Sequence, residues 1–242
     1  MIYSSCLLEV IIMQVSHTNE KDKKFVPVIE STLRKRIVDV PHEIYDASGI
    51  KIFGKRIKSL IFSTDVAIIK NSNADGVIAV YPFTPQLSIT QAIIEVSPSP
   101  VFAGVGGGLT TGARSIDIAL DAELHGAFGV VLNAPTPNEL INEMRKRIDI
   151  PIIVTVVSER EDIDARIAAG TTILNVSGGA KTPEIVANIR QRYPYFPIIA
   201  TGGPTVESIL KTIKAGANTI TYTPPTSGEL FARIMENYRE TL

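Results

Sequence analysis

The sequence predicts an α/β protein, a single (β/α)8 barrel of the TIM type preceded by an N-terminal extension. From residue 57 onward it contains eight short apolar runs rich in Val and Ile. None alternates cleanly between apolar and polar residues, so each fits a strand covered on both faces. Helix-compatible segments and short connections separate the runs, which is typical of strand–helix units around a parallel sheet. An open doubly wound sheet is the alternative, because the pattern does not show closure.

The predicted elements follow one another in regular order. Three Thr-Pro pairs place a hydroxyl before a proline at a helix start, and three Ser/Thr–Glu pairs have capping-box spacing. Glycines mark the helix ends. The strands are Ser59–Phe62, Val77–Tyr81, Val101–Gly104, Gly129–Asn133, Ile152–Val157, Ile173–Ser177, Ile198–Gly202 and Thr219–Thr223. The helix signals are Thr84-Pro85, Thr136-Pro137, Thr182-Pro183, Thr136/Glu139, Ser158/Glu161, Thr226/Glu229, Gly126, Gly170 and Gly216.

Three segments are predicted along the chain. Residues 1–24 form a poorly ordered tail in which Met13 is an alternative start to Met1. Residues 25–56 form an extension with a short helix at Ser31–Val40 and a strand at Gly49–Ile57 that bends at a glycine. This extension is expected to plug or cover the N-terminal mouth of the barrel, and a functional lid is the alternative. Residues 57–242 form the barrel, one domain without an internal linker.

Composition narrows the function. Lys and Arg total 24 against 25 Asp and Glu, so no overall charge favours nucleic acid or an acidic membrane. A single cysteine, Cys6, excludes an internal disulfide framework and fits the cytoplasm. No stretch reaches the ~18–20 apolar residues of a membrane helix. No metal-ligand spacing and no Gly-x-Ser-x-Gly elbow occurs, so we expect neither a bound metal nor another cofactor.

An anion-binding site is predicted near the end of the chain. Active sites of such barrels form where the strands end. Thr201, Gly202 and Gly203 end the seventh strand, and Gly-rich turns before a helix expose backbone N–H groups to anions. The turn Thr226-Ser227-Gly228, after the eighth strand, is the second predicted contact. The alternative is that Gly202-Gly203 only makes a tight turn.

At these residues the chain resembles the phosphate-binding (β/α)8 superfamily, which includes keto-deoxy-phosphogluconate aldolase, thiamin-phosphate synthase and N-acylmannosamine-phosphate epimerase. The resemblance covers the architecture of about residues 57–242, whereas its motif is only Ala200-Thr201-Gly202-Gly203. It implies that the loops after strands 7 and 8 hold a substrate phosphate. The sixth strand carries Asn175 rather than the Schiff-base lysine of the aldolases. The lysine–acid pair of the epimerases and the basic side chain expected of a flavin oxidase are also absent.

Few side chains at the predicted rim can move protons. Glu159 and Asp65 are the candidate bases, although either fits equally well as an acidic residue in the first turn of a helix. Tyr81 could exchange a proton or simply pack. Asn133 and Asn175 end covered strands, so their amides need partners and suit an orienting or enolate-stabilising role.

Two further loops are candidate ligand contacts. Gly106 and Gly107 follow the third strand in a run that does not match the dinucleotide fingerprint. Ser177, Gly178 and Gly179 follow the sixth strand. Both loops could let a ligand approach the backbone, and the glycine-rich run after the third strand could instead serve as a flexible gate.

The sequence thus predicts an enzyme that acts on a small phosphorylated metabolite by proton transfer next to a carbonyl, as an isomerase, an epimerase or a lyase without a Schiff base. Two alternatives stay open. One is a barrel that binds a phosphorylated ligand without turnover, as a sensor or assembly partner. The other is a hydrolase that no motif supports. A homo-oligomer is compatible with the sequence.

Overall fold

The computed structural model describes residues 27, 29, 31 and 38–241. The chain divides into a unit of residues 1–37 and a unit of residues 38–242, and the second is described here. The predicted tail and most of the helix predicted at Ser31–Val40 lie outside the described residues. The end of that helix is wrong, because Val38 forms a parallel β-bridge with Ser72 and its N–H donates to the carbonyl of Asn71 at 2.6 Å.

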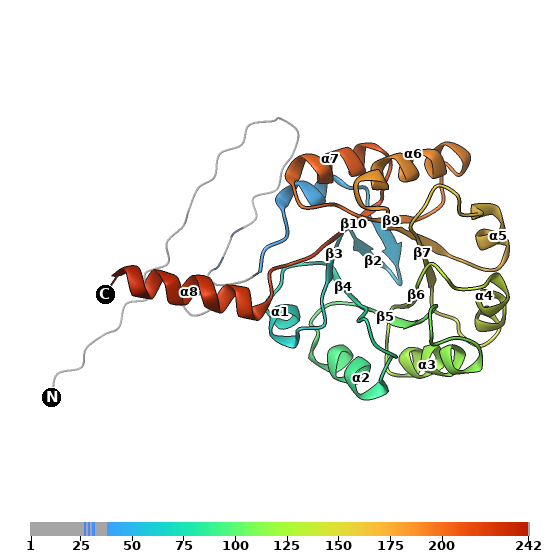
Figure 1. Ribbon diagram of the computed structural model, residues 1–242, viewed down its shortest axis with the longest axis horizontal. Helices are drawn as coiled ribbons and strands as arrows, with labels where there is room; N and C mark the ends of the chain where they lie inside the picture. The colour runs from blue at the N-terminus through green and yellow to red at the C-terminus, as the bar shows by residue number, and fades with distance from the viewer. Residues whose placement is uncertain (1–26, 28, 30, 32–37, 242) are drawn as a thin grey trace. The chain divides into compact units, whose positions relative to one another are not determined.

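Eight parallel strands close into a barrel, in the order β10-β3-β4-β5-β6-β7-β8-β9 (Figure 1). Closure is made by β10 and β3, where Ile220 pairs with Ser59. This pairing confirms the barrel and excludes the open sheet. The strands are β3 (Ser59–Phe62), β4 (Gly76–Ala79), β5 (Val101–Gly106), β6 (Gly129–Leu132), β7 (Ile152–Val156), β8 (Ile173–Val176), β9 (Ile198–Thr201) and β10 (Thr219–Tyr222).

A helix follows each strand. Gly126, Gly170 and Gly216 have φ values of 93°, 111° and 110°, which confirms the predicted helix ends, because this left-handed backbone favours glycine. The helices are α1 (Val66–Lys70), α2 (Leu87–Val96), α3 (Ala113–Leu124), α4 (Asn138–Arg145), α5 (Ile163–Ala168), α6 (Thr182–Arg192, after the 3-10 turn η3, Gly179–Lys181), α7 (Val206–Lys214) and α8 (Ser227–Thr241).

The observed helix starts agree less well with those predicted from the sequence. The Thr226/Glu229 capping box is present, with both reciprocal hydrogen bonds, at 2.7 Å and 3.2 Å. The box at Thr136/Glu139 is wrong, since α4 begins after Pro137 with no side-chain cap. Each of the remaining hydroxyls also lacks the predicted capping role: α2 begins after Gln86, α5 begins after Asp162, and the Thr182 hydroxyl instead accepts from the Gly178 N–H.

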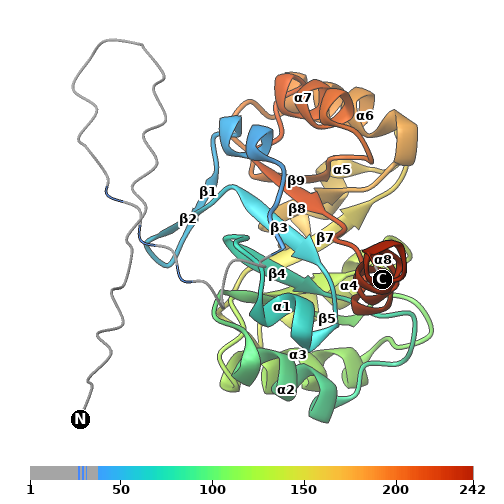
Figure 2. The same ribbon diagram turned by 90° about the vertical axis from the view of Figure 1, so that its left-hand side faces the viewer.

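The segment predicted as one bent strand is a hairpin of β1 (Ile50–Ile52) and β2 (Lys55–Ile57). The chain reverses at Phe53 and Gly54, both with positive φ. Ile52 and Ile57 belong to the same buried cluster as the inward-facing Phe102 of β5. The hairpin therefore lies against the barrel interior at the end where the strands begin, and α8 leaves from the opposite end (Figure 2).

A short 3-10 helix before the hairpin, η2 (His42–Asp46), covers part of the outside of the barrel. Its Ile44 is fully buried in a cluster with Ile61 and Ile220, whose side chains face outward from β3 and β10. The last helix, α8, contains no buried residue. None of the helices in the described residues is long and apolar enough to cross a membrane.

Candidate functional site

A cavity of about 190 Å³ opens at the C-terminal ends of β4, β5 and β6. It lies where barrels of this architecture carry their active sites. No charged side chain lines it, and two of the predicted catalytic residues do, Tyr81 and Asn133. The lining residues are Val80, Tyr81, Pro82, Phe83, Thr84, Pro85, Gly104, Gly106, Gly108, Leu109, Thr110, Val131 and Asn133.

Tyr81 is held by the backbone of its own loop. Its hydroxyl accepts from the N–H of Gln86 at 2.7 Å and lies 3.3 Å from the Gln86 carbonyl, to which it can donate. These two contacts hold the phenol in place at the cavity, where its hydroxyl acts as both a hydrogen-bond donor and an acceptor.

Asn133 lies just beyond β6 and is exposed, contrary to the expectation of a covered amide. Its backbone N–H donates to the carbonyl of Gly106 at 2.9 Å, which joins the loops after β5 and β6. Asn133 is also one of the residues that line the cavity.

Asn175 does not line this cavity. Its Nδ2 donates to the Thr155 hydroxyl at 3.3 Å across the interior faces of β8 and β7. Within the described residues, its buried Oδ1 and the buried Oγ1 of Thr221 have no hydrogen-bond partner. Unpaired buried acceptors are costly, so a water or a ligand is expected to complete this side of the interior. The structure therefore separates the two asparagines that the sequence grouped.

Asp65 works as a helix cap at the end of β3. Its Oδ1 accepts from the N–H groups of Ala67 and Ile68 at 2.9 Å and 3.2 Å, and its Oδ2 accepts from the Ser227 N–H at 3.3 Å. A hydrogen bond from the Ser227 side chain is the largest cause of a lowered pKa for Asp65, which burial partly opposes. A carboxylate held in this way is a weaker base than the sequence suggested.

Asp65→Ala is expected to lower the free energy of unfolding by about 1 kcal/mol at pH 7, the usual cost of losing a cap. The Asp65 pKa is lower in the folded state, so its contribution is present above the unfolded pKa of 3.8 and is lost as the pH falls through the lower folded value. Urea denaturation from pH 7 down to pH 3 measures this. Asp117→Ala, at an exposed position of α3, is the control. A loss of stability that stays constant with pH would contradict the assignment.

Glu159 lies away from the cavity. It is exposed and lines a separate groove with α6 residues such as Asn188 and Arg192. It also precedes α5 by several residues, so the expectation that it lies in a first helical turn is wrong. Nothing in this arrangement brings Glu159 to Tyr81 or Asn133.

The Gly202-Gly203 turn is explained largely by packing. A Cβ at Gly202 would lie 2.7 Å from Ile220 Cγ2 and 2.8 Å from Ile209 Cγ1, and its N–H donates to the Thr221 carbonyl at 3.1 Å. Gly203 has a φ of 81° and turns beside Ser208. Because the Gly202 N–H is bonded to the Thr221 carbonyl, Gly202 has no backbone donor left for an anion. The neighbouring Thr201 hydroxyl donates to the hydroxyl of Ser177 at 3.2 Å.

Carboxylates already occupy the second predicted phosphate contact. The Thr226 N–H donates to Glu229 at 2.7 Å, and the Ser227 N–H donates to Asp65. A Cβ at Gly228 would meet nothing closer than 3.9 Å, so this residue borders open space. Two negative charges beside the start of α8 oppose a phosphate dianion there.

Packing also accounts for most of the other candidate glycines. A Cβ on Gly106 would lie 2.2 Å from Ser115 Oγ, one on Gly107 would lie 2.5 Å from the Asn133 backbone nitrogen, and one on Gly178 would lie 2.4 Å from Ile185 Cδ1. Gly179 instead turns in open space with a φ of 61°. Among the glycines of the loop after β5, Gly108 alone both lines the cavity and has open space where a Cβ would lie.

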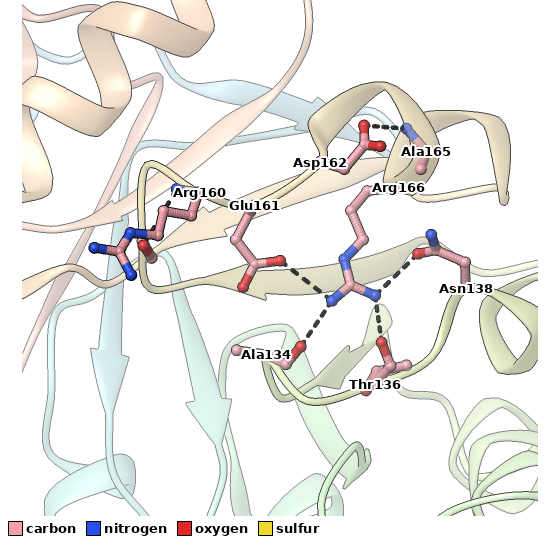
Figure 3. Close-up of polar contacts among 9 residues, drawn as sticks. Ala134, Thr136, Asn138, Arg160, Glu161, Asp162, Ala165 and Arg166 are labelled. Carbon is pink, nitrogen blue, oxygen red and sulfur yellow. Dashed lines mark hydrogen bonds and ion pairs between the residues drawn. The ribbon is translucent and has the colours of Figure 1, made fainter.

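A buried arginine that was not among the predicted site residues lies beside the loop that carries Asn133. Arg166 of α5 is 9% exposed, and its guanidinium donates to the carbonyl oxygens of Ala134, at 2.7 Å, and Thr136 (Figure 3). It also reaches Asn138 Oδ1 at 3.0 Å and the carboxylate of Glu161 at 3.2 Å. Arg166 thus holds the loop that begins with Asn133. The one available signal was its position on the apolar face of α5, next to Ile163.

Among the residues that the structure describes, no three His, Cys, Asp or Glu side chains gather as a potential metal site. The fold and the cavity define the class of protein: a (β/α)8 barrel with an uncharged pocket at its C-terminal mouth.

Comparison with known proteins supports the fold. No family model and no curated protein matches the chain. Among solved structures, phosphoenolpyruvate phosphomutase from Streptomyces platensis subsp. rosaceus has a TM-score of 0.57 and 15% identity, over 81% of this chain and 83% of that one. The 2,3-dimethylmalate lyase, of the PEP mutase/isocitrate lyase superfamily, has a TM-score of 0.56 and 13% identity, over 86% and 84%.

A third neighbour, 4-hydroxy-tetrahydrodipicolinate synthase from Methylacidiphilum fumariolicum SolV, has a TM-score of 0.56 and 16% identity, over 74% and 71%. Identities this low establish the barrel fold alone. The three enzyme families named from the sequence are not supported by these neighbours.

Proposed function

We propose that this chain is an enzyme that acts on a small phosphorylated metabolite by proton transfer next to a carbonyl. The cavity that Tyr81 and Asn133 share carries the proposal, because it brings a proton donor–acceptor and a neutral amide to one opening. Tyr81 would exchange the proton. The Asn133 Nδ2 would donate to the carbonyl oxygen and stabilise the charge that develops there.

The substrate phosphate would lie across the mouth, against the N–H group of Gly203 in the turn before α7. Hydrogen-bond donors at helix starts suit anions, and the carboxylates of Asp65 and Glu229 at the start of α8 disfavour a second contact there. Fold neighbours include a phosphomutase and a lyase, so the architecture is compatible with this chemistry.

A second candidate is a barrel that binds its ligand without turnover. It is favoured by the positions of Asp65, which caps two helices, and of Glu159, which lines a different groove. Tyr81 is then the only titratable side chain among the residues that line the cavity. The two functions differ in whether Tyr81 is needed for chemistry or only for binding.

Exchange of a substrate C–H hydrogen for deuterium distinguishes the enzyme from the non-catalytic barrel. A panel of phosphorylated aldehydes and ketones incubated with the protein in D2O should include a compound that exchanges at the carbon next to its carbonyl, observed by NMR. Tyr81→Phe is expected to slow exchange at least ~100-fold, the usual contribution of a general acid–base group, with little loss of binding. Asn133→Ala should slow exchange by a comparable factor.

Matched controls are Tyr195→Phe, at a 97% exposed position, and Asn142→Ala, on the exposed side of α4. Both should exchange at the wild-type rate. Binding of a panel member without exchange would support the non-catalytic barrel. Equal exchange rates in wild type and Tyr81→Phe would remove Tyr81 from the mechanism.

A further inference from the structure

We propose that the cavity between the loops after β4 and β5 binds an uncharged apolar group of the ligand, which Phe83 and Leu109 contact at the entrance. This inference deepens and partly rests on the proposed function. It adds a compact hydrocarbon group, bound in the cavity, to the phosphate proposed at the other side of the mouth.

The absence of charge from the lining argues for an uncharged occupant. Val80, Pro82, Pro85 and Val131 contribute apolar contacts, and none of the thirteen lining residues is Lys, Arg, His, Asp or Glu. A carboxylate or phosphate placed here would lose its water without gaining a charged partner, which is costly. Tyr81, Asn133, Thr84 and Thr110 also line the cavity, so the occupant can carry a neutral carbonyl or hydroxyl beside its apolar part.

The size of the cavity limits the group. Its volume is about 190 Å³. An apolar cavity of ~150 Å³ is large enough to hold benzene. The occupant is therefore one ring or a branched chain of about five or six carbons, rather than a two-ring system.

Two exposed side chains mark the entrance. Phe83 is 72% exposed and Leu109 is 103% exposed, although both line the cavity. A single exposed apolar residue is ordinary, but two on successive loops that converge on one opening indicate a surface that a ligand covers. Gly108, next to Leu109, also lines the cavity, and a Cβ added there would contact nothing within 4 Å, so the opening is not crowded at this point.

Calorimetric titration of the full chain with four compounds tests the inference: inorganic phosphate, isopentyl phosphate, phenyl phosphate and isopentanol. We expect isopentyl and phenyl phosphate to bind at least about tenfold more tightly than inorganic phosphate, because each buried methylene adds favourable transfer free energy. Phe83→Ser and Leu109→Ser should remove most of that gain and leave the affinity for inorganic phosphate unchanged. Both residues are exposed, so neither change should impair folding.

Phe231→Ser and Leu124→Ser are the controls, at positions 68% and 77% exposed outside the cavity. They should bind all four compounds as wild type does. Isopentanol binding that is lost in Leu109→Ser, with no contribution from phosphate, would retain the apolar site and overturn the phosphate half of the proposed function. Inorganic phosphate binding to which the hydrocarbon adds nothing would overturn the apolar site alone. Gains lost equally in the control variants would also overturn it, as nonspecific adhesion.

Discussion

Replacing Arg166 with alanine is expected to lower the free energy of unfolding by about 3 kcal/mol, which urea denaturation measures. The guanidinium is buried and donates to two backbone carbonyls, an amide oxygen and a carboxylate. Removing one partner of a buried charged network leaves the other groups buried without a hydrogen-bond partner. This typically costs ~3–5 kcal/mol. The Glu161 carboxylate, with a side chain only 16% exposed, would be left without its cation.

Arg192→Ala is the matched control. Arg192 pairs with Asp164 through side chains that are 56% and 64% exposed, and exposed pairs contribute at most about 1 kcal/mol. Arg166→Lys should recover part of the loss, because one ammonium cannot reproduce the fork of hydrogen bonds. Equal, small losses in Arg166→Ala and Arg192→Ala would show that the buried contacts contribute little.

The second large effect is expected at Gly107, where alanine should also cost about 3 kcal/mol. Gly107 has a φ of 101°, and its Cβ would lie 2.5 Å from the backbone nitrogen of Asn133 and 2.8 Å from its carbonyl oxygen. The unfavourable φ costs ~1–2 kcal/mol and overpacking ~1–3 kcal/mol more. The overlap is with backbone, so the loop that carries Asn133 must move.

The adjacent glycine provides the comparison. Gly108 has no positive φ, and an added Cβ would contact nothing within 4 Å, so Gly108→Ala should change stability by less than about 0.5 kcal/mol. Thermal or urea denaturation of the pair decides whether the two glycines differ in this way. Similar stabilities for the two variants would contradict the packing assigned to Gly107.

Strand positions were predictable because the apolar runs are short, Val- and Ile-rich and bounded by turns. Ser59–Phe62 coincides with β3, and the other seven predicted strands overlap β4 to β10. Helix starts were harder, because a cap depends on where the chain turns. Thr136 has capping-box spacing, yet its hydroxyl is buried without a partner in the described residues while Arg166 binds its carbonyl. Local spacing cannot anticipate a contact made across thirty residues.

The candidate site was likewise predictable in part. The rule that strand ends carry the active site led to Tyr81 and Asn133, which do line one cavity. The same rule also selected Asp65 and Glu159, and it could not tell that one caps two helices or that the other lines an outer groove. Phe83 and Leu109 were missed because an apolar residue in a loop has no recognisable pattern.

The sequence by itself determined the repeat of eight strands and helices along the chain and the strand ends where polar residues gather, because these follow from periodicity and local turn chemistry. Tertiary structure alone decided closure, the covering of β3 and β10 by η2, and the choice of Tyr81 and Asn133 over the carboxylates. Those features depend on distances between segments far apart in the chain. The Gly202-Gly203 turn illustrates the difference: its glycines were visible in the sequence, but only the packing of Ile209 and Ile220 shows why Gly202 must be small.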